Sequence, residues 1–284
     1  MTTIAITGAT GQLGRLAIAA LKRRTPTANL IALVRNPANA ADLGVALRTA
    51  DYHKAETLAP ALAGVDVLVL ISSNDFNDRT GQHDRVIAAA KAAGVGHIVY
   101  TSILKGAASP MILVQDHIVT EATLKASGID YTILRNGWYT ENYTGSLGGA
   151  LAAGAMIGSA GTGRISTAAR ADYAEAIAVT ATSTGHAGKT YELAGDTGYT
   201  MADMAAEVSR QTGKTIPYNS LPQDVYQGIL QSFGLPEDLS AALADSDAYA
   251  AQGYLFDDSK TLSTLIGRPT TPMADTVADA LAAL

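Results

Sequence analysis

TIAITGATGQLGRLAIAALKRR, residues 3–24, is the stretch that decides the fold of this 284-residue chain. A short apolar run at residues 4–6 is followed by a glycine-rich turn from Thr7 to Gly14. The segment after the turn has apolar residues at helical spacing, namely Leu13, Leu16, Ala17, Ala20 and Leu21. Strand, glycine-rich turn and amphipathic helix in this order form the context that a dinucleotide-binding motif requires.

The three glycines of the turn, Gly8, Gly11 and Gly14, are spaced G-x-x-G-x-x-G. This is a variant of the dinucleotide fingerprint G-x-G-x-x-G. We expect Gly8 to let the chain leave the strand sharply, Gly11 to leave room for a pyrophosphate, and Gly14 to let the helix pack close to the sheet. Backbone N–H groups at the helix start then face the phosphates. The alternative is a turn without a ligand, but the flanking strand and helix favour the dinucleotide interpretation.

A second apolar segment, residues 29–34, predicts the next strand, and it ends at Arg35. In dinucleotide folds, an acidic residue about 20 positions after the last glycine binds the adenosine ribose. Here Arg35 occupies that place. A guanidinium binds a 2′-phosphate through charge-assisted hydrogen bonds, so we expect NADPH as the cofactor. The alternative is a solvated arginine at the end of a strand.

The composition narrows the function classes. The net charge is −6, which argues against nucleic acids or anionic membranes as partners. The chain has no cysteine, so disulfides, thiolate catalysis and cysteine-ligated metals are excluded. No apolar run is long enough to predict a membrane span, and the early first strand leaves no room for a signal peptide. We expect a cytoplasmic protein, with a homodimer left open.

Apolar strands alternate with helical segments through residue 135, which predicts an α/β, Rossmann-type, doubly wound parallel sheet. We expect an NADP-binding domain at residues 1–135 and a smaller, mostly helical α/β domain at residues 136–284. Parts of residues 136–200 are expected to return to the Rossmann sheet. Acidic residues gather late in the chain without the spacing of a metal loop, so we expect helix caps and no metal site at Asp245, Asp247, Asp257 and Asp258.

Polar residues follow two of the predicted strands. Asp51 is a candidate for the adenine amino group, and it also suits the N-cap of the helix expected at residues 54–62. Ser72, Ser73 and Asn74 follow the apolar segment 65–71. Because ligands bind at the carboxyl ends of strands in such sheets, these three are candidates for the ribose and nicotinamide side of the cofactor. Turn and capping roles are the alternative.

Residues 136–143, NGWYTENY, hold the only tryptophan and follow the strand predicted at residues 131–135. Their place at the carboxyl end of a strand predicts that they wall the substrate cleft. The alternative is a packed loop that covers apolar surface.

Several segments together carry a family resemblance: TGATGQLG (7–14), VRNPA (34–38), ADY (50–52), ISS (71–73), YTS (100–102), LRNGWYTENY (134–143) and FDDSKTLSTLIGRPTT (256–271). The chain resembles the NmrA-like, atypical short-chain dehydrogenase/reductases, and among them the bacterial type 2 NAD(P)H:quinone oxidoreductases. The glycine motif is widespread, whereas the run RNGWYTENY is much more specific.

The resemblance implies a set of cofactor-binding residues: Gly8, Ala9, Thr10, Gly11, Gln12 and Leu13 for the pyrophosphate, Arg35 for the 2′-phosphate, and Ser72, Ser73, Asn74, Asn136, Gly137, Trp138, Tyr139, Thr140, Glu141 and Thr167 around the rest. Gly14 of the glycine motif and Asp51 complete the cofactor-binding residues that we expect. For the substrate pocket we expect Asn74, Ile103, Leu104, His117, Gly137, Trp138, Tyr139 and Tyr143.

One departure from the wider superfamily matters for the chemistry. Typical short-chain dehydrogenases use a serine with Tyr-x-x-x-Lys, in which the lysine lowers the pKa of the tyrosine. Ser102 stands at the serine position, but none of the twelve tyrosines has a lysine four residues later. By spacing, Leu113 and His117 occupy the tyrosine and lysine positions. Alcohol or ketone chemistry therefore lacks an evident proton donor.

A quinone acceptor removes this difficulty, because its reduced form is a stabilised phenolate. We expect two-electron reduction by direct hydride transfer from NADPH, without flavin or metal, with proximity and orientation as the main contributions. Water or His117 delivers the proton afterwards. The alternative for His117 is a polar helix residue that faces solvent.

Two other functions remain open at this point. A non-catalytic NAD(P)-sensing regulator that acts through a protein partner fits the missing Tyr-x-x-x-Lys equally well. A reductase of another activated double bond, such as an enone, needs an acceptor of the same electrophilicity.

Overall fold

The computed structural model describes residues 2–26 and 28–284, and the chain forms two compact units. Unit 1 consists of Met1–Ile103, Asp116–Arg135 and Arg170–Tyr191. Unit 2 consists of Leu104–Gln115, Asn136–Ala169 and Glu192–Leu284. The chain thus passes between the units several times, and each unit is described by itself.

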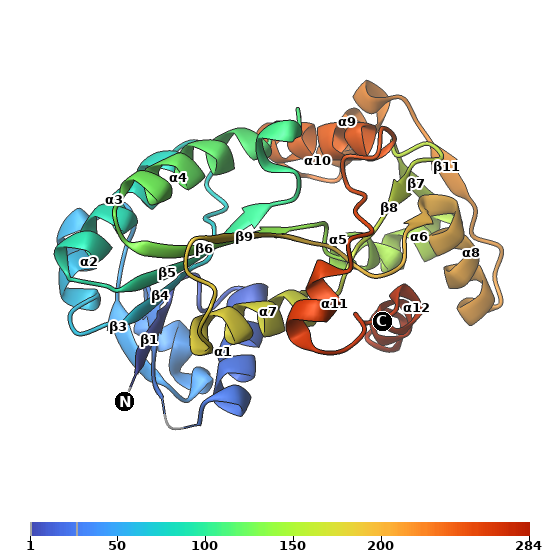
Figure 1. Ribbon diagram of the computed structural model, residues 1–284. Helices are drawn as coiled ribbons and strands as arrows, with labels where there is room; N and C mark the ends of the chain where they lie inside the picture. Colours follow the sequence, from blue (N-terminus) through green and yellow to red (C-terminus); the bar gives the residue numbers. More distant parts are fainter. Residues whose placement is uncertain (1, 27) are drawn as a thin grey trace. The chain divides into compact units, whose positions relative to one another are not determined.

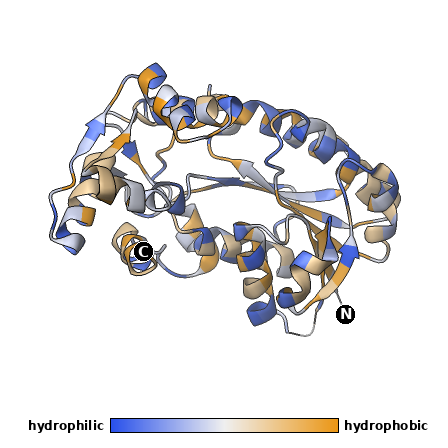
Figure 2. Ribbon diagram, turned by 180° about the vertical axis from the view of Figure 1, so that it is seen from behind, coloured by the Kyte–Doolittle hydropathy of each residue, from blue (hydrophilic) through white to orange (hydrophobic). Residues whose placement is uncertain are grey.

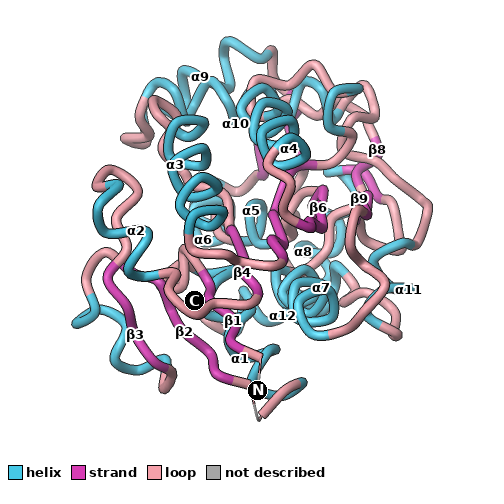
Figure 3. Tube along the Cα trace, turned by 60° about the vertical axis from the view of Figure 1, so that its left-hand side comes forward, coloured by secondary structure: helices cyan, strands magenta, loops and turns pink. Residues whose placement is uncertain are grey.

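Unit 1 is built on a seven-stranded sheet in the order β3-β2-β1-β4-β5-β6-β9, the last strand of which runs on into unit 2. Its strands are β1 (Thr3–Ile6), β2 (Asn29–Val34), β3 (Ala46–Thr49), β4 (Val67–Leu70), β5 (His97–Ile103), β6 (Asp130–Asn136) and β9 (Lys189–Leu193). The pairs β1–β2, β1–β4, β2–β3 and β4–β5 are parallel. Figure 3 shows β3, β2, β1 and β4 side by side. The doubly wound, Rossmann-type prediction is confirmed.

Helices cover both faces of this sheet (Figure 1). They are α1 (Gln12–Arg24) and α7 (Arg170–Thr182) on one face, with α2 (Ala55–Ala61), α3 (Arg79–Ala92) and α4 (Val114–Ala126) on the other. Strand β4, with the sequence VLVL, is almost fully buried, as a strand covered on both faces should be. Hydrophilic and hydrophobic residues alternate along the helices in Figure 2, which is typical of helices with one buried face.

The turn between β1 and α1 depends on two of its glycines. Gly8 has a φ of 58°, a left-handed conformation that favours glycine. A Cβ on Gly14 would lie 2.2 Å from the carbonyl oxygen of Gly8, so the first turn of α1 touches the backbone that precedes it. Gly14 thus allows close packing of the helix on the turn itself, while the expected close packing on the sheet stays a prediction.

Unit 2 is largely helical. Its helices are α5 (Glu141–Thr144), α6 (Leu147–Ala153), α8 (Met201–Thr212), α9 (Gln223–Ser232), α10 (Glu237–Ala250), α11 (Thr261–Ile266) and α12 (Met273–Ala282). Two small sheets join them, in which β7 (Met156–Gly158) pairs with β11 (Tyr218–Ser220) and β8 (Arg164–Ile165) with β10 (Tyr199–Thr200). These four strands were not predicted, because two or three residues carry no periodic pattern.

The expectation of capping roles for the late acidic residues is wrong for Asp245 and Asp247. Both lie in the middle of α10 and are buried. Asp245 accepts a hydrogen bond from the Ile112 N–H at 2.8 Å, and Asp247 accepts one from the Ser159 N–H at 2.9 Å. They hold other segments of unit 2 against α10. Within the described ranges, no group of acidic or histidine side chains could hold a metal ion.

We expect Gly14→Ala to destabilise the protein by about 3 kcal/mol, because the added methyl overlaps the backbone of Gly8 and Ala9. Gly228→Ala is the matched control, since a Cβ there, in the middle of α9, meets nothing within 4 Å. That control should stabilise the protein by up to about 1 kcal/mol. Urea unfolding of both variants is the measurement, and equal stability changes would contradict the assigned role of Gly14.

Candidate functional site

The start of α1 offers backbone donors to an anion. The Gly11 N–H donates to the Gly8 oxygen at 2.9 Å, and the Arg15 N–H donates to the Gly11 oxygen at 3.0 Å. Gly11 caps the helix without any side-chain hydrogen bond. The N–H groups of the first turn, from Gln12 to Gly14, therefore have no intrahelical acceptor, and the helix dipole favours a negative charge there. The turn fits the pyrophosphate of a dinucleotide.

Arg35 follows the last residue of β2 and is exposed. In the described parts of the chain, nothing engages its guanidinium. Arg15, the other arginine near the turn, is occupied, because it pairs with Asp42 and its Nε donates to the Thr10 oxygen at 3.2 Å. Arg35 is thus available for a 2′-phosphate.

Asp51 does not cap α2. The N-cap position is Lys54, and Asp51 Oδ1 instead accepts a hydrogen bond from the His53 N–H at 3.1 Å. The expected capping role is wrong because the chain makes a tight turn before the helix begins. The expected contact of Asp51 with adenine stays a prediction.

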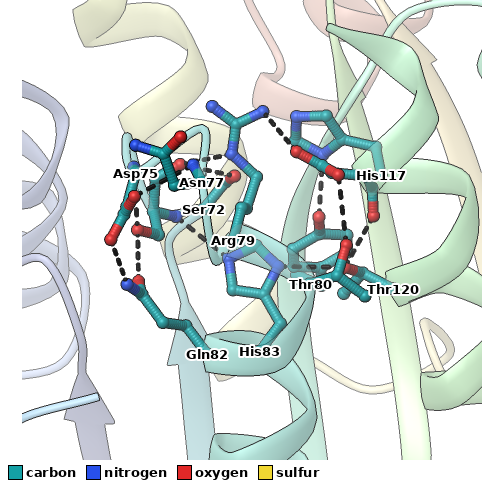
Figure 4. Close-up of polar contacts among 12 residues, drawn as sticks. Ser72, Asp75, Asn77, Arg79, Thr80, Gln82, His83, His117 and Thr120 are labelled. Carbon is teal, nitrogen blue, oxygen red and sulfur yellow. Dashed lines mark hydrogen bonds and ion pairs between the residues drawn. The ribbon is translucent and has the colours of Figure 1, made fainter. Parts of the chain in front are cut away.

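The segment from Ser72 to Asn74 follows β4 and is held rigidly at Ser73. The Ser73 N–H donates to His83 Nε2 at 3.0 Å, its hydroxyl donates to Gln82 Oε1 at 2.5 Å, and its carbonyl accepts from Arg79 Nε at 2.7 Å. Figure 4 shows these side chains of α3 gathered around the segment. Ser73 Oγ also accepts the Asp75 N–H at 3.2 Å, so Ser73 has a turn role as well. The N–H, hydroxyl and carbonyl groups of Ser73 are all engaged. Ser72 is held as well, because its N–H donates to Thr101 Oγ1 at 2.9 Å.

The tautomer of His83 follows from its partners. Because Nε2 accepts the Ser73 N–H, the ring proton is on Nδ1, which donates to Thr120 Oγ1 at 2.9 Å. Thr120 in turn donates to the Asp116 carbonyl at 2.8 Å. Burial, with the Arg79 charge adding to it, lowers the pKa of His83 to about 3. The ring is therefore neutral, and its hydrogen bond with the Ser73 N–H fixes the position of the Ser72–Asn74 segment.

His117 is 7 % exposed, so the alternative of a helix residue that faces solvent is wrong. Its Nδ1 lies 2.7 Å from the hydroxyl of Tyr100, which is fully buried. Burial lowers the pKa of His117 well below the usual value, and the charge of Arg79 acts in the same direction. The ring of His117 is therefore neutral, so it carries a single N–H and is not a strong proton donor.

Ser102, at the place of the superfamily's catalytic serine, is already occupied. Its hydroxyl donates to Glu121 Oε1 at 2.7 Å, in a buried contact. Arg135 binds the same carboxylate with two nitrogens, at 2.8 Å and 2.7 Å. Burial alone would raise the pKa of Glu121, but the hydrogen bonds from Arg135 and Ser102 outweigh it and lower that pKa. The serine therefore belongs to a structural ion-pair network.

The predicted residues of unit 2 form a second, separate group. The Thr140 hydroxyl lies 2.7 Å from that of Thr167, and Thr167 lies 2.5 Å from the hydroxyl of Tyr199. Tyr139 pairs with Ala168 in a short parallel bridge. The stretch Asn136–Glu141 is thus joined to Thr167, two segments that the sequence separates by almost thirty residues.

Other predicted residues of unit 2 already make hydrogen bonds within the protein. The Tyr143 hydroxyl donates to Asp247 Oδ1 at 3.1 Å, and burial raises the pKa of both groups. Asn136 donates to the Tyr139 hydroxyl at 3.3 Å, while its buried Oδ1 has no partner among the described residues. Trp138 is 8 % exposed, and Gly137 donates to the Leu193 oxygen at 2.7 Å. Leu104, also in unit 2, is fully buried, whereas Ile103 belongs to unit 1.

Three residues around His117 were not singled out from the sequence: Arg79, His83 and Tyr100. In the sequence, Arg79 looks like any charged residue at the start of a helix, and His83 is one of five histidines. Their importance comes from burial in one polar cluster, for which a single sequence holds no signal.

Comparison with known proteins places the chain in a family. A model of the NAD(P)H-binding family matches residues 8–183, more than half of the chain. The chain belongs to this family. It is 52% identical to quinone oxidoreductase 2 of Escherichia coli (strain K12) over 277 residues, which cover 96% of this chain and 97% of that protein. The match confirms the resemblance predicted from the sequence.

Solved structures agree with this membership. The E. coli NADPH-dependent quinone oxidoreductase QOR2 in complex with NADPH superposes with a TM-score of 0.95 at 51% identity, over 98% of this chain and 99% of that one. A Citrobacter sp. triphenylmethane reductase in complex with NADP(H) superposes with a TM-score of 0.92 at 35% identity, over the same shares of the two chains. In addition, no described helix of this family member has the length and apolar character to cross a membrane.

We expect Ser102→Ala to cost about 1 kcal/mol of stability, because Glu121 loses one hydrogen bond, and to leave NADPH oxidation nearly unchanged. Urea unfolding and steady-state kinetics on the same preparation are the measurements. A loss of kcat of more than about tenfold would contradict the structural assignment of Ser102.

His83 predicts a pH dependence of stability. Its pKa is about 3 when folded and about 6.5 in an unfolded chain, so the unfolded state binds more protons between these values. The free energy of unfolding therefore falls as the pH drops below about 6.5. His83→Gln should reduce this slope by up to about 1.4 kcal/mol per pH unit. Urea unfolding of both proteins between about pH 4 and pH 8 measures it, and identical slopes would refute the assignment.

Proposed function

We propose that this protein reduces quinones by two electrons with NADPH as the reductant, without flavin or metal. The observation that carries the proposal is the 52% identity to E. coli quinone oxidoreductase 2 over nearly the full length of both chains. The superposition on the NADPH complex of the E. coli enzyme supports the choice of cofactor.

In this proposal, different residues of the chain bind different parts of the cofactor. The first turn of α1 binds the pyrophosphate through its N–H groups, and Arg35 binds the 2′-phosphate. Ser72 and Asn74 face the ribose and nicotinamide side, on a segment that Arg79 and His83 hold in place. For Asn136 to Glu141 and Thr167 we keep the cofactor role predicted from the sequence. Asn136 brings an unpartnered buried oxygen to that role.

When bound, the cofactor supplies a hydride from C4 of its nicotinamide. The protein needs no strong acid for this step, because the quinone becomes a stabilised phenolate. This agrees with the absence of Tyr-x-x-x-Lys and with Ser102 bound to Glu121. The contribution of the side chains is to orient the acceptor and exclude water, which supplies much of the rate in such reactions.

For the substrate side we retain Asn74, Ile103 and His117 in unit 1, and Leu104, Trp138, Tyr139 and Tyr143 in unit 2. Since the His117 ring is neutral, the proton that completes the hydroquinone comes from water, and His117 can relay it. We place the protein in the cytoplasm and leave a homodimer as a question for solution measurements.

The first test is a flavin-free, metal-free assay. Purified protein, NADPH and 1,4-benzoquinone are mixed, and the loss of NADPH absorbance is followed against a control without protein. Enzyme-dependent oxidation that is faster with NADPH than with NADH is the expected result. Tight NADPH binding without any turnover would instead favour a nucleotide sensor that acts through a protein partner.

We expect Arg35→Ala to raise the KM for NADPH by about tenfold or more and to leave the KM for NADH nearly unchanged, because only NADPH carries the 2′-phosphate. Arg23→Ala, which removes an exposed arginine from the last turn of α1, is the control and should alter neither KM. Equal increases for both cofactors in Arg35→Ala would reject the 2′-phosphate role.

A further inference from the structure

Gln82 is a buried residue whose amide contacts two separate loops of unit 1, the loop after β3 (residues 50–54) and the loop after β4 (residues 71–78). It lies in the first turn of α3 and is 2 % exposed. Its Oε1 accepts the Ser73 hydroxyl at 2.5 Å, and its Nε2 lies 3.2 Å from Nε2 of His53. One buried side chain therefore joins the two loops.

The chemistry of the partners fixes the orientation of this amide. An ionised carboxylate only accepts hydrogen bonds, so the Gln82 atom that lies 2.7 Å from Asp75 Oδ2 is the amide nitrogen. An amide nitrogen carries two hydrogens, so the second one is donated to the ring nitrogen of His53. Figure 4 shows the amide of Gln82 directed toward Asp75. Gln82 thus uses both hydrogens and its oxygen at once, and a side chain without them breaks every link.

Arg85, about one turn further along α3, ties the loop after β3 a second time. Its Nε donates to the Tyr52 oxygen at 2.7 Å, and its Nη2 pairs with Asp78. Asp78 is the last residue before α3 and belongs to the loop after β4. The pair lies against Gly81, where a Cβ would be 2.3 Å from Asp78 Oδ1. Since Gln82 and Arg85 are three residues apart, one face of α3 holds both loops.

Both loops carry residues that we predict to contact the cofactor. In the loop after β3, Asp51 Oδ1 accepts the His53 N–H at 3.1 Å, so the place of His53 sets that of the candidate adenine contact. In the loop after β4, the Asp75 N–H donates to Ser73 Oγ at 3.2 Å, next to the candidates for the nicotinamide side. A ligand binds more tightly to a site that is already ordered, because less conformational entropy is lost. Links that keep both loops in place therefore favour binding of the whole cofactor.

We propose that Gln82 and Arg85 are positioning residues of the cofactor site, which hold the loop for the adenine and the loop for the nicotinamide side in one fixed arrangement. The inference rests on the proposed use of NADPH and adds two residues of α3 to its site. Gln82 serves both loops, whereas Arg85 acts on the adenine side. Neither residue distinguishes NADPH from NADH, because the adenine, the riboses and the nicotinamide are common to both cofactors.

The experiment compares the whole cofactor with its adenosine half. Titration calorimetry gives the Kd of NADPH and that of 2′,5′-ADP, which carries the adenine and the 2′-phosphate without the nicotinamide. Gln82→Met, which is close in volume but makes no such hydrogen bonds, should raise the Kd of NADPH about tenfold and that of 2′,5′-ADP only about threefold. The two effects differ because the substitution releases both loops, whereas the probe occupies only one of them.

A second variant and a matched control complete the set. Arg85→Gln should raise both Kd values by the same factor of about three, because it releases only the loop after β3. The side chain of Arg85 is 33 % exposed, so this substitution leaves no buried cavity. Gln211→Met is the control and should change neither Kd, since the Gln211 amide joins α8 to the Ala274 oxygen of α12 in unit 2. In both α3 variants the KM for NADH should rise together with the KM for NADPH, unlike in Arg35→Ala.

The outcomes are distinct. A Kd of NADPH that changes no more in Gln82→Met than in Gln211→Met overturns the inference. Equal increases for NADPH and 2′,5′-ADP in Gln82→Met overturn the link to the nicotinamide side, and an unchanged Kd of 2′,5′-ADP in both α3 variants overturns the link to the adenine side. A wild-type protein that binds NADPH and responds to these variants as expected but reduces no quinone overturns the proposed function and leaves the positioning role supported.

Discussion

The contact between the first turn of α1 and the backbone of Gly8 is the constraint on which the N-terminal half of unit 1 depends. Only a residue without Cβ fits at Gly14, and only a left-handed residue fits at Gly8. Together they place the N-terminus of a long helix directly at the end of β1, where its free N–H groups and its dipole favour a bound anion. The same contact holds α1 against the turn that precedes it, so the predicted phosphate site and the fold depend on the same geometry.

The polar cluster beside β4 and β5 follows a different logic. Its members are buried, and buried polar groups are stable only when most of their hydrogen bonds are made. His83 is fully satisfied and neutral, and it fixes the Ser72–Asn74 segment. Arg79 donates to the Ser73 oxygen and reaches Asp116, and His117 contacts the Tyr100 hydroxyl.

Ser102 stands at the position of the catalytic serine of typical short-chain dehydrogenases, but its hydroxyl makes a structural contact with Glu121. In this chain the serine hydroxyl, Glu121 and Arg135 form one buried ion-pair network next to β5 and β6. Such a network holds strands and helix α4 together, and it removes the serine from acid–base chemistry. The acceptor must then be electrophilic enough to accept hydride without a strong acid, which a quinone is and a simple ketone is not.

The sequence by itself determined the Rossmann-type sheet and its glycine-rich turn, and it predicted Arg35 as the residue for the 2′-phosphate, because glycine spacing, apolar runs and charge at strand ends are local properties. It also predicted the family, through RNGWYTENY above all. Only the tertiary structure showed that Asp247 ties α10 to Ser159, that His117 is buried against Tyr100, and that Arg79 is a buried cation. These features depend on burial and on partners distant in the chain, and a pKa shift or a buried hydrogen bond exists only once the surrounding atoms are in place.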